Sequence, residues 1–212
     1  MPKIVVHIIE SGAPDDILLS RLEGSALRET LNLLDIPVTY HQVVNEEMLA
    51  RAFEQADEWY TAAGLGDERA DDALQVLHIS AHGNKAGIVT TTNEQVTWAR
   101  LKDLVRGYSE GSGEDVLLTL SSCNGYNAWN VIAGPEFGVV SIVGPKGKPT
   151  WQETVVGFQT FYHHLSSQDD LDLDSAVGAM KIASMHASFA HCAPDAARLL
   201  RVKHRLKSRK AS

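Results

Sequence analysis

The sequence predicts an α/β fold: a three-layer sandwich with a mostly parallel central sheet and helices on both of its faces. Short runs rich in Val, Ile and Leu alternate along the chain with longer segments whose apolar residues recur at helical spacing. This alternation is typical of strands joined by helical crossovers, which run parallel. The runs are also apolar at nearly every position, as expected of strands that are buried on both faces.

The same two patterns divide the chain into consecutive elements. Strand patterns are short and rich in β-branched residues, and helix patterns are longer and amphipathic. Glycine, proline and polar clusters mark the connections between them. The predicted order is strand 3–10, helix 15–35, strand 37–44, helix 46–63, a strand ending at 82, a β-hairpin across 86–98, helix 98–108, a strand from 116, helix 128–133, strand 138–143, helix 151–165, helix 173–190 and a last helix from 194.

Local signals support the first and last of these helices. Asp15 and Asp16 follow Pro14 and are expected to cap and charge the start of the first helix. In the last helix Pro194 opens the first turn and Asp195 lies within it. Both helices therefore begin with an acidic turn, which the helix dipole favours.

Composition predicts one globular domain that covers residues 1–212. The chain has 212 residues, of which 44% are hydrophobic and 22% charged, enough for a sizeable core. No apolar stretch approaches the roughly 18 residues of a membrane span, and no secretory signal opens the chain. The 2 cysteines are too few for a disulfide framework. We therefore expect a cytoplasmic protein with free thiols and no membrane partner.

Charge is spread unevenly along the chain. The formal net charge is −8, yet residues 198–210 hold seven of the 19 Lys and Arg residues. The rest of the chain is more acidic still, which makes nucleic acid an unlikely main partner. The basic segment predicts a C-terminal helix at about 195–210. A solvated helix face is the favoured interpretation, and contact with an anionic partner is the alternative.

Two of the predicted strands end in reactive side chains. One leads into Ser80-Ala81-His82-Gly83, and the other into Ser121-Ser122-Cys123-Asn124-Gly125. In open α/β sheets the working crevice lies beyond the carboxyl ends of the strands, so His82 and Cys123 are expected to meet there. An imidazole stabilises the thiolate that attacks a carbonyl group. A lone His or Cys at a strand end more often serves in packing, but their matching positions favour chemistry.

Other kinds of site fit the sequence less well. A tyrosine-phosphatase-type loop requires an arginine six residues after the cysteine, where this chain has Trp129. His163 and His164 are adjacent, so they would point about 100° apart on a helix and lack matching metal ligands. The acidic segment 169–174 has neither the glycine nor the final glutamate of an EF-hand. We expect no metal and no cofactor.

The paired motifs resemble those of caspase-like cysteine peptidases, the group that includes caspases, metacaspases, gingipains and separase. The bacterial CHAT domain is the most similar, over roughly residues 74–190. The resemblance implies that His82 is the general base and Cys123 the nucleophile. It also implies that the backbone N–H groups of Gly83 and Cys123 form an oxyanion hole, and that an acyl-enzyme forms on a peptide substrate. Relatives of this type serve as effectors in bacterial antiphage defence.

Substrate specificity is less clear from the motifs. Metacaspases carry an acidic residue two positions before the cysteine, which selects basic side chains. Ser121 stands there in this chain, so that position does not support a preference for Arg or Lys. Trp151 follows the loop 144–149 and is a candidate wall of the substrate pocket. It is equally compatible with a role in capping the next helix against the core.

These observations predict a cysteine endopeptidase that acts on a protein or peptide through a Cys–His dyad. Because 212 residues leave no room for a separate sensor domain, we expect control by an activating partner protein or a small signalling ligand. Two alternatives remain open. One is a catalytically silent caspase-like module that binds a ligand or partner. The other is a cysteine-dependent acyltransferase or another hydrolase with the same geometry.

Overall fold

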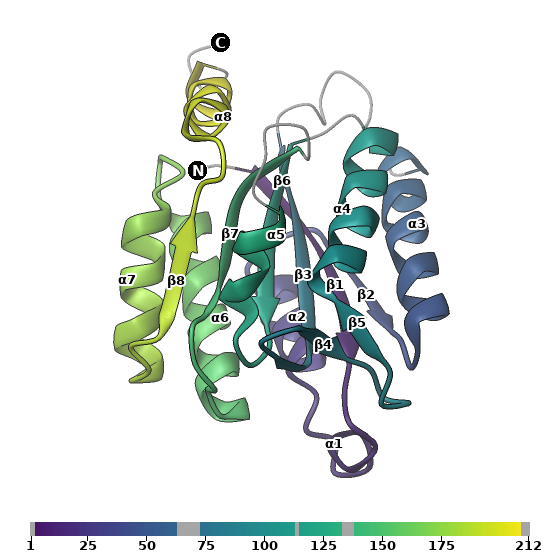
Figure 1. Cartoon of the computed structure of the whole chain (residues 1–212). Coiled ribbons are helices and arrows are strands. Elements are labelled where there is room, and N and C mark those ends of the chain that lie inside the picture. Colours follow the sequence, from purple (N-terminus) through teal and green to yellow (C-terminus); the bar gives the residue numbers. More distant parts are fainter. Residues whose placement is uncertain (1–2, 63–72, 113–114, 133–137, 209–212) are drawn as a thin grey trace.

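A mostly parallel sheet forms the centre of the protein (Figure 1). The computed structural model describes residues 3–62, 73–112, 115–132 and 138–208. The strand order is β2-β1-β3-β6-β7-β8, and all neighbours are parallel except β7 and β8. The small strands β4 and β5 form an antiparallel extension of β3. The strands are β1 Lys3–Ser11, β2 Val38–Gln42, β3 Ala73–Asn84, β4 Gly87–Val89, β5 Gln95–Thr97, β6 Val116–Ser121, β7 Val139–Pro145 and β8 Phe189–Cys192.

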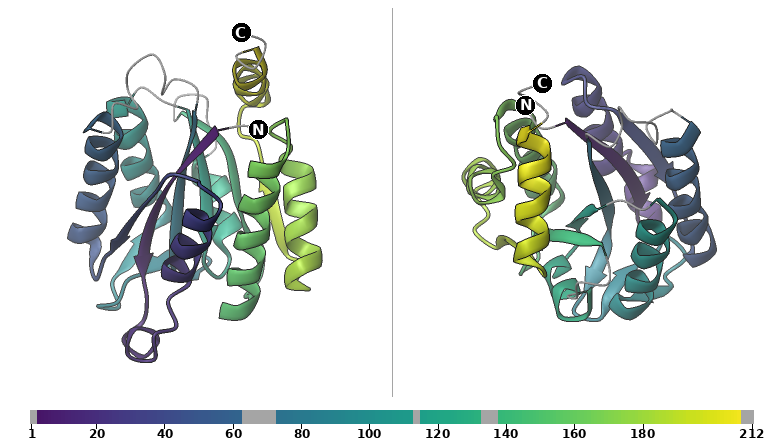
Figure 2. Two further views of the ribbon diagram at one scale, coloured as in Figure 1. Left: turned by 180° about the vertical axis from the view of Figure 1, so that it is seen from behind. Right: turned by 90° about the horizontal axis from the view of Figure 1, so that it is seen from above.

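Helices cover both faces of this sheet (Figure 2). One hydrophobic cluster joins the sheet to α2, α6, α7 and α8, and a second joins it to α3, α4 and α5. The predicted three-layer α/β arrangement is therefore confirmed. The helices are α1 Pro14–Leu18, α2 Glu23–Leu33, α3 Glu46–Ala62, α4 Trp98–Ser112, the 3-10 helix η1 Gly125–Ala128, α5 Trp129–Ile132, α6 Trp151–Ser167, α7 Leu173–Ser184 and α8 Ala196–Ser208.

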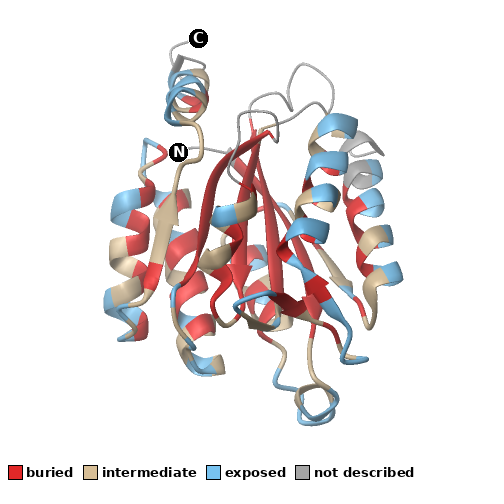
Figure 3. Ribbon diagram, in the orientation of Figure 1, coloured by how far each residue is buried: buried red, intermediate tan, exposed pale blue. Residues whose placement is uncertain are grey.

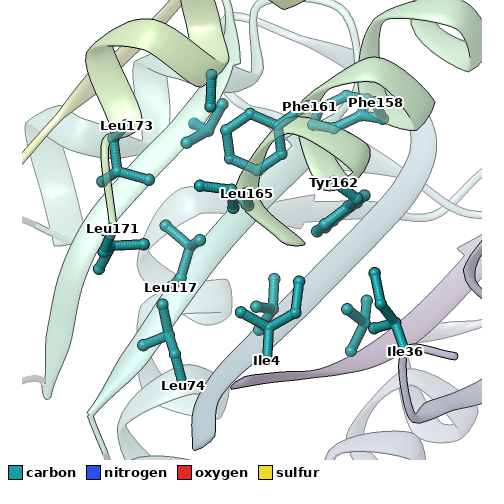
Figure 4. Packing of buried hydrophobic residues seen from close by; sticks show 14 of the residues in the cluster. Ile4, Ile36, Leu74, Leu117, Phe158, Phe161, Tyr162, Leu165, Leu171 and Leu173 are labelled. Atoms are coloured by element: carbon teal, nitrogen blue, oxygen red, sulfur yellow. The ribbon is translucent and has the colours of Figure 1, made fainter. Parts of the chain in front are cut away.

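Alternate residues of the central strands enter opposite cores, as the pleat of a strand requires. On β3, Val76 belongs to the α2/α6 side and Leu77 to the α3/α4 side, and neither is exposed. The strands are consequently buried over most of their length (Figure 3). Phe158 and Tyr162 of α6 fill much of the α2/α6 side (Figure 4). Burial on both faces explains why the strand sequences show little alternation.

The first and the penultimate predicted helices differ most from the structure. The first is divided into α1 and α2, because Ser20 between them has a left-handed φ of 53°. The helix expected at 173–190 ends at Ser184, and Met185 follows with a φ of 56°. The chain then forms β8, which pairs with the outer edge of β7. A strand this short depends on a free edge to bond, so it leaves little signal in the local sequence.

The basic segment forms α8, at the opposite end of the sheet from α1 (Figure 1). The apolar side of α8 packs against the hydrophobic core, because Val202 is only 1% exposed. Lys207 forms an ion pair with Asp170 at 2.8 Å. The helix was predicted to reach about residue 210, and the last two of those positions lie outside the described residues. Within the described ranges no helix combines the length and apolarity needed to cross a membrane.

A fully buried histidine links the first three strands of the sheet. His7 has no exposed surface, and its ring contacts Thr39 Oγ1 through Nδ1 at 2.9 Å and Gln75 Oε1 through Nε2 at 3.1 Å. Burial lowers the pKa of His7 to about 4, because a charged imidazolium is poorly solvated there. The bond to Gln75 opposes this shift. His7 is therefore neutral in the folded protein down to mildly acidic pH.

This histidine should make stability depend on pH. Below pH 6.5 the unfolded chain protonates His7 while the folded chain does not until about pH 4. The free energy of unfolding should thus fall as the pH is lowered across that range, with His7 contributing up to about 3 kcal/mol of the loss. Urea denaturation of the wild type and of His7→Gln measures this difference. Parallel curves of stability against pH for the two proteins would contradict it.

Candidate functional site

The α2/α6 face of the sheet turns polar toward the carboxyl ends of β3 and β6. Ser80 of β3 is the register partner of Ser121 of β6, and both are buried. Side chains alternate along a strand, so His82 lies on the same face of β3 as Ser80. Cys123 follows β6 in a turn, and its side chain lines the same cavity as that of His82.

The strand that carries His82 continues beyond it. β3 was predicted to end at His82, but it extends to Asn84, where its last residues pair antiparallel with β4. His82 itself is the register partner of Val89. The hairpin takes over as partner because β6 stops pairing with β3 at Ser121. The backbone of His82 is therefore held by antiparallel pairing with β4 and does not lie in a loop.

Cys123 lies in a tight turn directly after β6. The N–H of Gly125 donates to the carbonyl of Ser122 at 2.9 Å, and Asn124 between them has a left-handed φ of 60°. Asparagine tolerates this conformation at the third position of a β-turn better than most residues. The N–H of Asn124 also donates to the carbonyl of Gly147 at 2.7 Å. This bond ties the loop after β7 to the turn that carries the thiol.

Gly83 allows the two strand ends to approach each other. A Cβ atom at this position would lie 2.9 Å from the carbonyl oxygen of Cys123 and 3.0 Å from Cβ of Ser122. The glycine is thus required by its contact with the cysteine turn. The N–H of Cys123 donates to no carbonyl oxygen of the described residues. The oxyanion hole assigned to the N–H groups of Gly83 and Cys123 stays a prediction.

The predicted catalytic side chains line a common cavity of about 120 Å³. The structure brings His82 and Cys123 there together with Ser121 and Trp151, the two tentative substrate-binding residues. Gly83 contacts the cysteine turn and is not among the residues that line the cavity. The remaining lining residues are Glu10, Ser11, Gly12, Asp16, Arg21, Glu23, Ser80, Ala81, Ser122, Pro149, Thr150 and Thr154.

Asp16 is a site residue that sequence reasoning missed. Its Oδ2 lies 2.7 Å from Nε2 of His82. The side chain of Asp16 is 25% exposed and that of His82 is 59% exposed, so the pair sits at the open side of the cavity. A bond at Nε2 leaves Nδ1 as the ring nitrogen available to a thiol. From the sequence, Asp16 was expected only at the start of a helix, although the connection that carries it leaves β1 at the edge of the sheet where ligands bind.

The surroundings of Cys123 favour its thiol form over the thiolate. Burial raises the pKa of this thiol above its ordinary value, while the charge of Lys148 and the residue's own N–H lower it. Among the described residues no hydrogen bond joins Cys123 to His82. An attack by Cys123 therefore requires a base to remove the proton as substrate binds. The pairing of His82 with Cys123 stays a prediction.

Trp151 lies at the start of α6 and also lines the cavity. It begins α6, whose first turn is closed by a capping box between Thr150 and Glu153. Its side chain also lines the cavity, and its indole Nε1 is buried without a hydrogen-bond partner among the described residues. Trp151 is thus a wall of the cavity that is held in place by a helix start. Stacking on a substrate stays a prediction.

Two buried glutamates form the acidic side of the cavity. Glu10 ends β1 and is 2% exposed, and Glu23 begins α2 and is 3% exposed. Burial raises the pKa of Glu10, and the neighbouring charge of Glu23 adds to this, while bonds from Gly24, Tyr40 and Ser25 oppose it. Within the described ranges no group of three or more His, Cys, Asp or Glu side chains is placed to hold a metal ion.

No protein-family model matches this chain, and no curated protein is significantly similar to it. The resemblance to caspase-like peptidases therefore rests on the paired motifs of the sequence. The motif residues share one cavity, one of them is bonded to a carboxylate, and the glycine after the histidine touches the cysteine turn.

The tight contact at Gly83 can be tested by adding a methyl group. Gly83→Ala should displace the cysteine turn, because the new Cβ would overlap a backbone oxygen at 2.9 Å. We expect reaction of Cys123 with an electrophile to slow at least tenfold, measured by mass spectrometry. Gly107→Ala is the control. No atom lies within 4 Å of a Cβ there, so this α4 substitution should stabilise the helix by about 0.5–1 kcal/mol. Equal labelling of both variants would contradict the prediction.

Proposed function

We propose that this protein is a cysteine endopeptidase with Cys123 as nucleophile, His82 as general base and Asp16 as the group that positions His82. The observation that carries the proposal is the placement of thiol and imidazole in one cavity, with the far nitrogen of the imidazole bonded to a carboxylate at 2.7 Å. Nucleophile, base and orienting group are the three parts that activate a weak nucleophile.

The reaction follows from these roles. Nδ1 of His82 accepts the thiol proton as Sγ of Cys123 bonds to the peptide carbonyl carbon. The resulting oxyanion is stabilised by backbone N–H groups, for which the N–H of Cys123 is the best-placed candidate. The C–N bond then breaks, and the imidazolium gives its proton to the leaving amine. Water attacks the thioester, again with His82 as base, and releases the acid and the free thiol.

Asp16 contributes in two ways. It fixes which ring nitrogen faces the thiol, and its negative charge stabilises the imidazolium that forms during the reaction. Because His82 is 59% exposed, this charge is partly screened by water in the resting protein. A bound substrate would cover the histidine and strengthen the interaction. These features support an enzyme whose activity rises when a substrate, an activating partner protein or a small signalling ligand orders the site.

The rest of the proposal concerns where the enzyme works. We place it in the cytoplasm, where reducing conditions keep Cys123 and Cys192 as the free thiols seen in the structure. A silent binding module is the second candidate. The observation that favours it is the lack of a hydrogen bond between His82 and Cys123.

Thiol-directed labelling separates the two candidates. A peptidyl acyloxymethyl ketone should modify the wild type once, at Cys123, as shown by intact mass and peptide mapping. Cys123→Ala and His82→Ala should lose the reaction. Cys192→Ala should retain it, because burial raises the pKa of that thiol to about 11 and leaves it unreactive. Absence of labelling in the wild type, or full labelling in His82→Ala, would reject the peptidase.

The orienting carboxylate has its own test. Asp16→Asn should lower kcat about tenfold to a hundredfold, less than is typical of a fully buried orienting aspartate, because the pair is partly exposed. Its KM should change little, because Asp16 acts on His82 rather than on the bound substrate. Asp15→Asn is the matched control on the same helix, and its kcat should match the wild type. Equal kcat values for both variants would remove Asp16 from the site.

A further inference from the structure

The loop after β7 carries Lys148 close to the cysteine turn. The N–H of Asn124, the residue after Cys123, donates to the carbonyl of Gly147, the residue before Lys148, at 2.7 Å. By standard backbone dimensions, the Cα atoms of Cys123 and Lys148 each lie within about 3 Å of their end of this hydrogen bond. The two Cα atoms are therefore separated by about 8 Å or less.

Further contacts hold this loop in place. The N–H of Lys146 donates to the carbonyl of Ser188 at 2.9 Å. A Cβ atom on Gly144, near the end of β7, would lie 3.0 Å from the backbone nitrogen of Tyr126, which follows the cysteine turn. The capping box of α6 fixes the other end of the loop. The position of Lys148 beside the cysteine turn is thus set by backbone contacts and does not depend on its own side chain.

The two lysines of this loop have different partners. Lys146 is placed over the ring of Tyr126, with its Nζ 4.7 Å from the ring centroid, and its charge acts on Cys192. Lys148 is exposed, and its side chain forms no ion pair within the described ranges. Its positive charge lowers the pKa of the Cys123 thiol, against the effect of burial. Lys148 is therefore the lysine whose charge reaches the proposed nucleophile.

The other charged groups around the cavity disfavour a thiolate. Besides Cys123, the titratable and charged side chains of the lining are Glu10, Asp16, Arg21, Glu23 and His82. Three of them are carboxylates, and negative charge near a thiol favours its protonated form. Arg21, the one guanidinium of the lining, is exposed, so water solvates its charge. A cation beside the thiol would offset the carboxylates.

We propose that Lys148 is the cation that stabilises the thiolate of Cys123 and thereby sets the rate at which this thiol reacts. The inference adds a residue to the proposed peptidase site and rests on that function. When Sγ of Cys123 gives its proton to Nδ1 of His82, a thiolate and an imidazolium form. Asp16 stabilises the imidazolium, and Lys148 stabilises the thiolate. Each of the two new charges then has a neighbour of opposite sign.

The attraction between Lys148 and the thiolate acts over a longer range than a hydrogen bond. Coulomb energy falls with the inverse of the distance, whereas a hydrogen bond weakens steeply once its geometry is lost. Because Lys148 is exposed, water and salt screen its charge in the resting protein. A substrate chain that covers the loop would exclude water and strengthen the attraction. The thiol should therefore be activated weakly at rest and more strongly in the covered site.

The rate of thiol alkylation tests the role of this charge. Iodoacetamide reacts with the thiolate and requires no recognition of a peptide, and peptide mapping separates Cys123 from Cys192. Lys148→Gln should slow alkylation of Cys123 at neutral pH by about threefold to tenfold, because loss of the cation raises the pKa of the thiol. The pH at which the rate is half-maximal should rise accordingly. Lys148→Arg should keep the wild-type rate, since it keeps the charge.

Lys146→Gln is the matched control on the same loop. It removes an equal charge that acts on Cys192, so alkylation of Cys123 should match the wild type. High salt should reduce the difference between the wild type and Lys148→Gln, which a purely structural change of the loop would not do. Equal rates for the wild type and Lys148→Gln would overturn the proposal. Equal losses in Lys148→Gln and Lys148→Arg would overturn it as well, because the charge would then not matter.

The same experiment distinguishes this inference from the peptidase itself. Iodoacetamide reports only on the thiolate, whereas the peptidyl ketone reports on the whole catalytic site. Slower alkylation of Lys148→Gln, without ketone labelling of the wild type, would support the role of Lys148 and reject the peptidase. Ketone labelling of the wild type, with equal alkylation rates for the wild type and Lys148→Gln, would leave the peptidase intact and remove Lys148 from its site.

Discussion

The carboxylate of Glu10 is the interaction on which the candidate site depends. It ends β1, accepts hydrogen bonds from the first N–H groups of α2, and receives the hydroxyls of Tyr40 from β2 and Ser80 from β3. A negative group at a helix N-terminus is favourable because unpaired N–H groups and the helix dipole both attract it. This one side chain therefore fixes the start of α2 against three strands. Glu23 opens that helix, so its position follows from the same contacts.

The central pair could be predicted because its determinants are local. The apolar runs before His82 and Cys123 form neighbouring parallel strands, so both residues follow the registered pair Ser80 and Ser121 at one edge of the sheet. Local pattern alone was sufficient for that result.

Asp16 and Glu23 were missed for the opposite reason. Both belong to the connection between β1 and the body of α2, whose course is set by contacts far away in sequence. The left-handed Ser20 breaks the helical pattern and sends α1 outward, where Asp16 reaches a histidine 66 residues further along the chain. The sequence around Asp16 carries no local signal for its contact with His82. The edge strand β8 was missed similarly, because it exists only where β7 offers an unpaired edge.

The hydrogen bond between the N–H of Asn124 and the carbonyl of Gly147 has a consequence for how such a site can diverge. Both partners are backbone atoms, so no exchange of side chains in the loop deletes the bond. Residues such as Lys148 and Pro149 can vary in size and charge while the loop stays attached to the cysteine turn. Mutation can therefore remodel the wall of the cavity without releasing the thiol from its place.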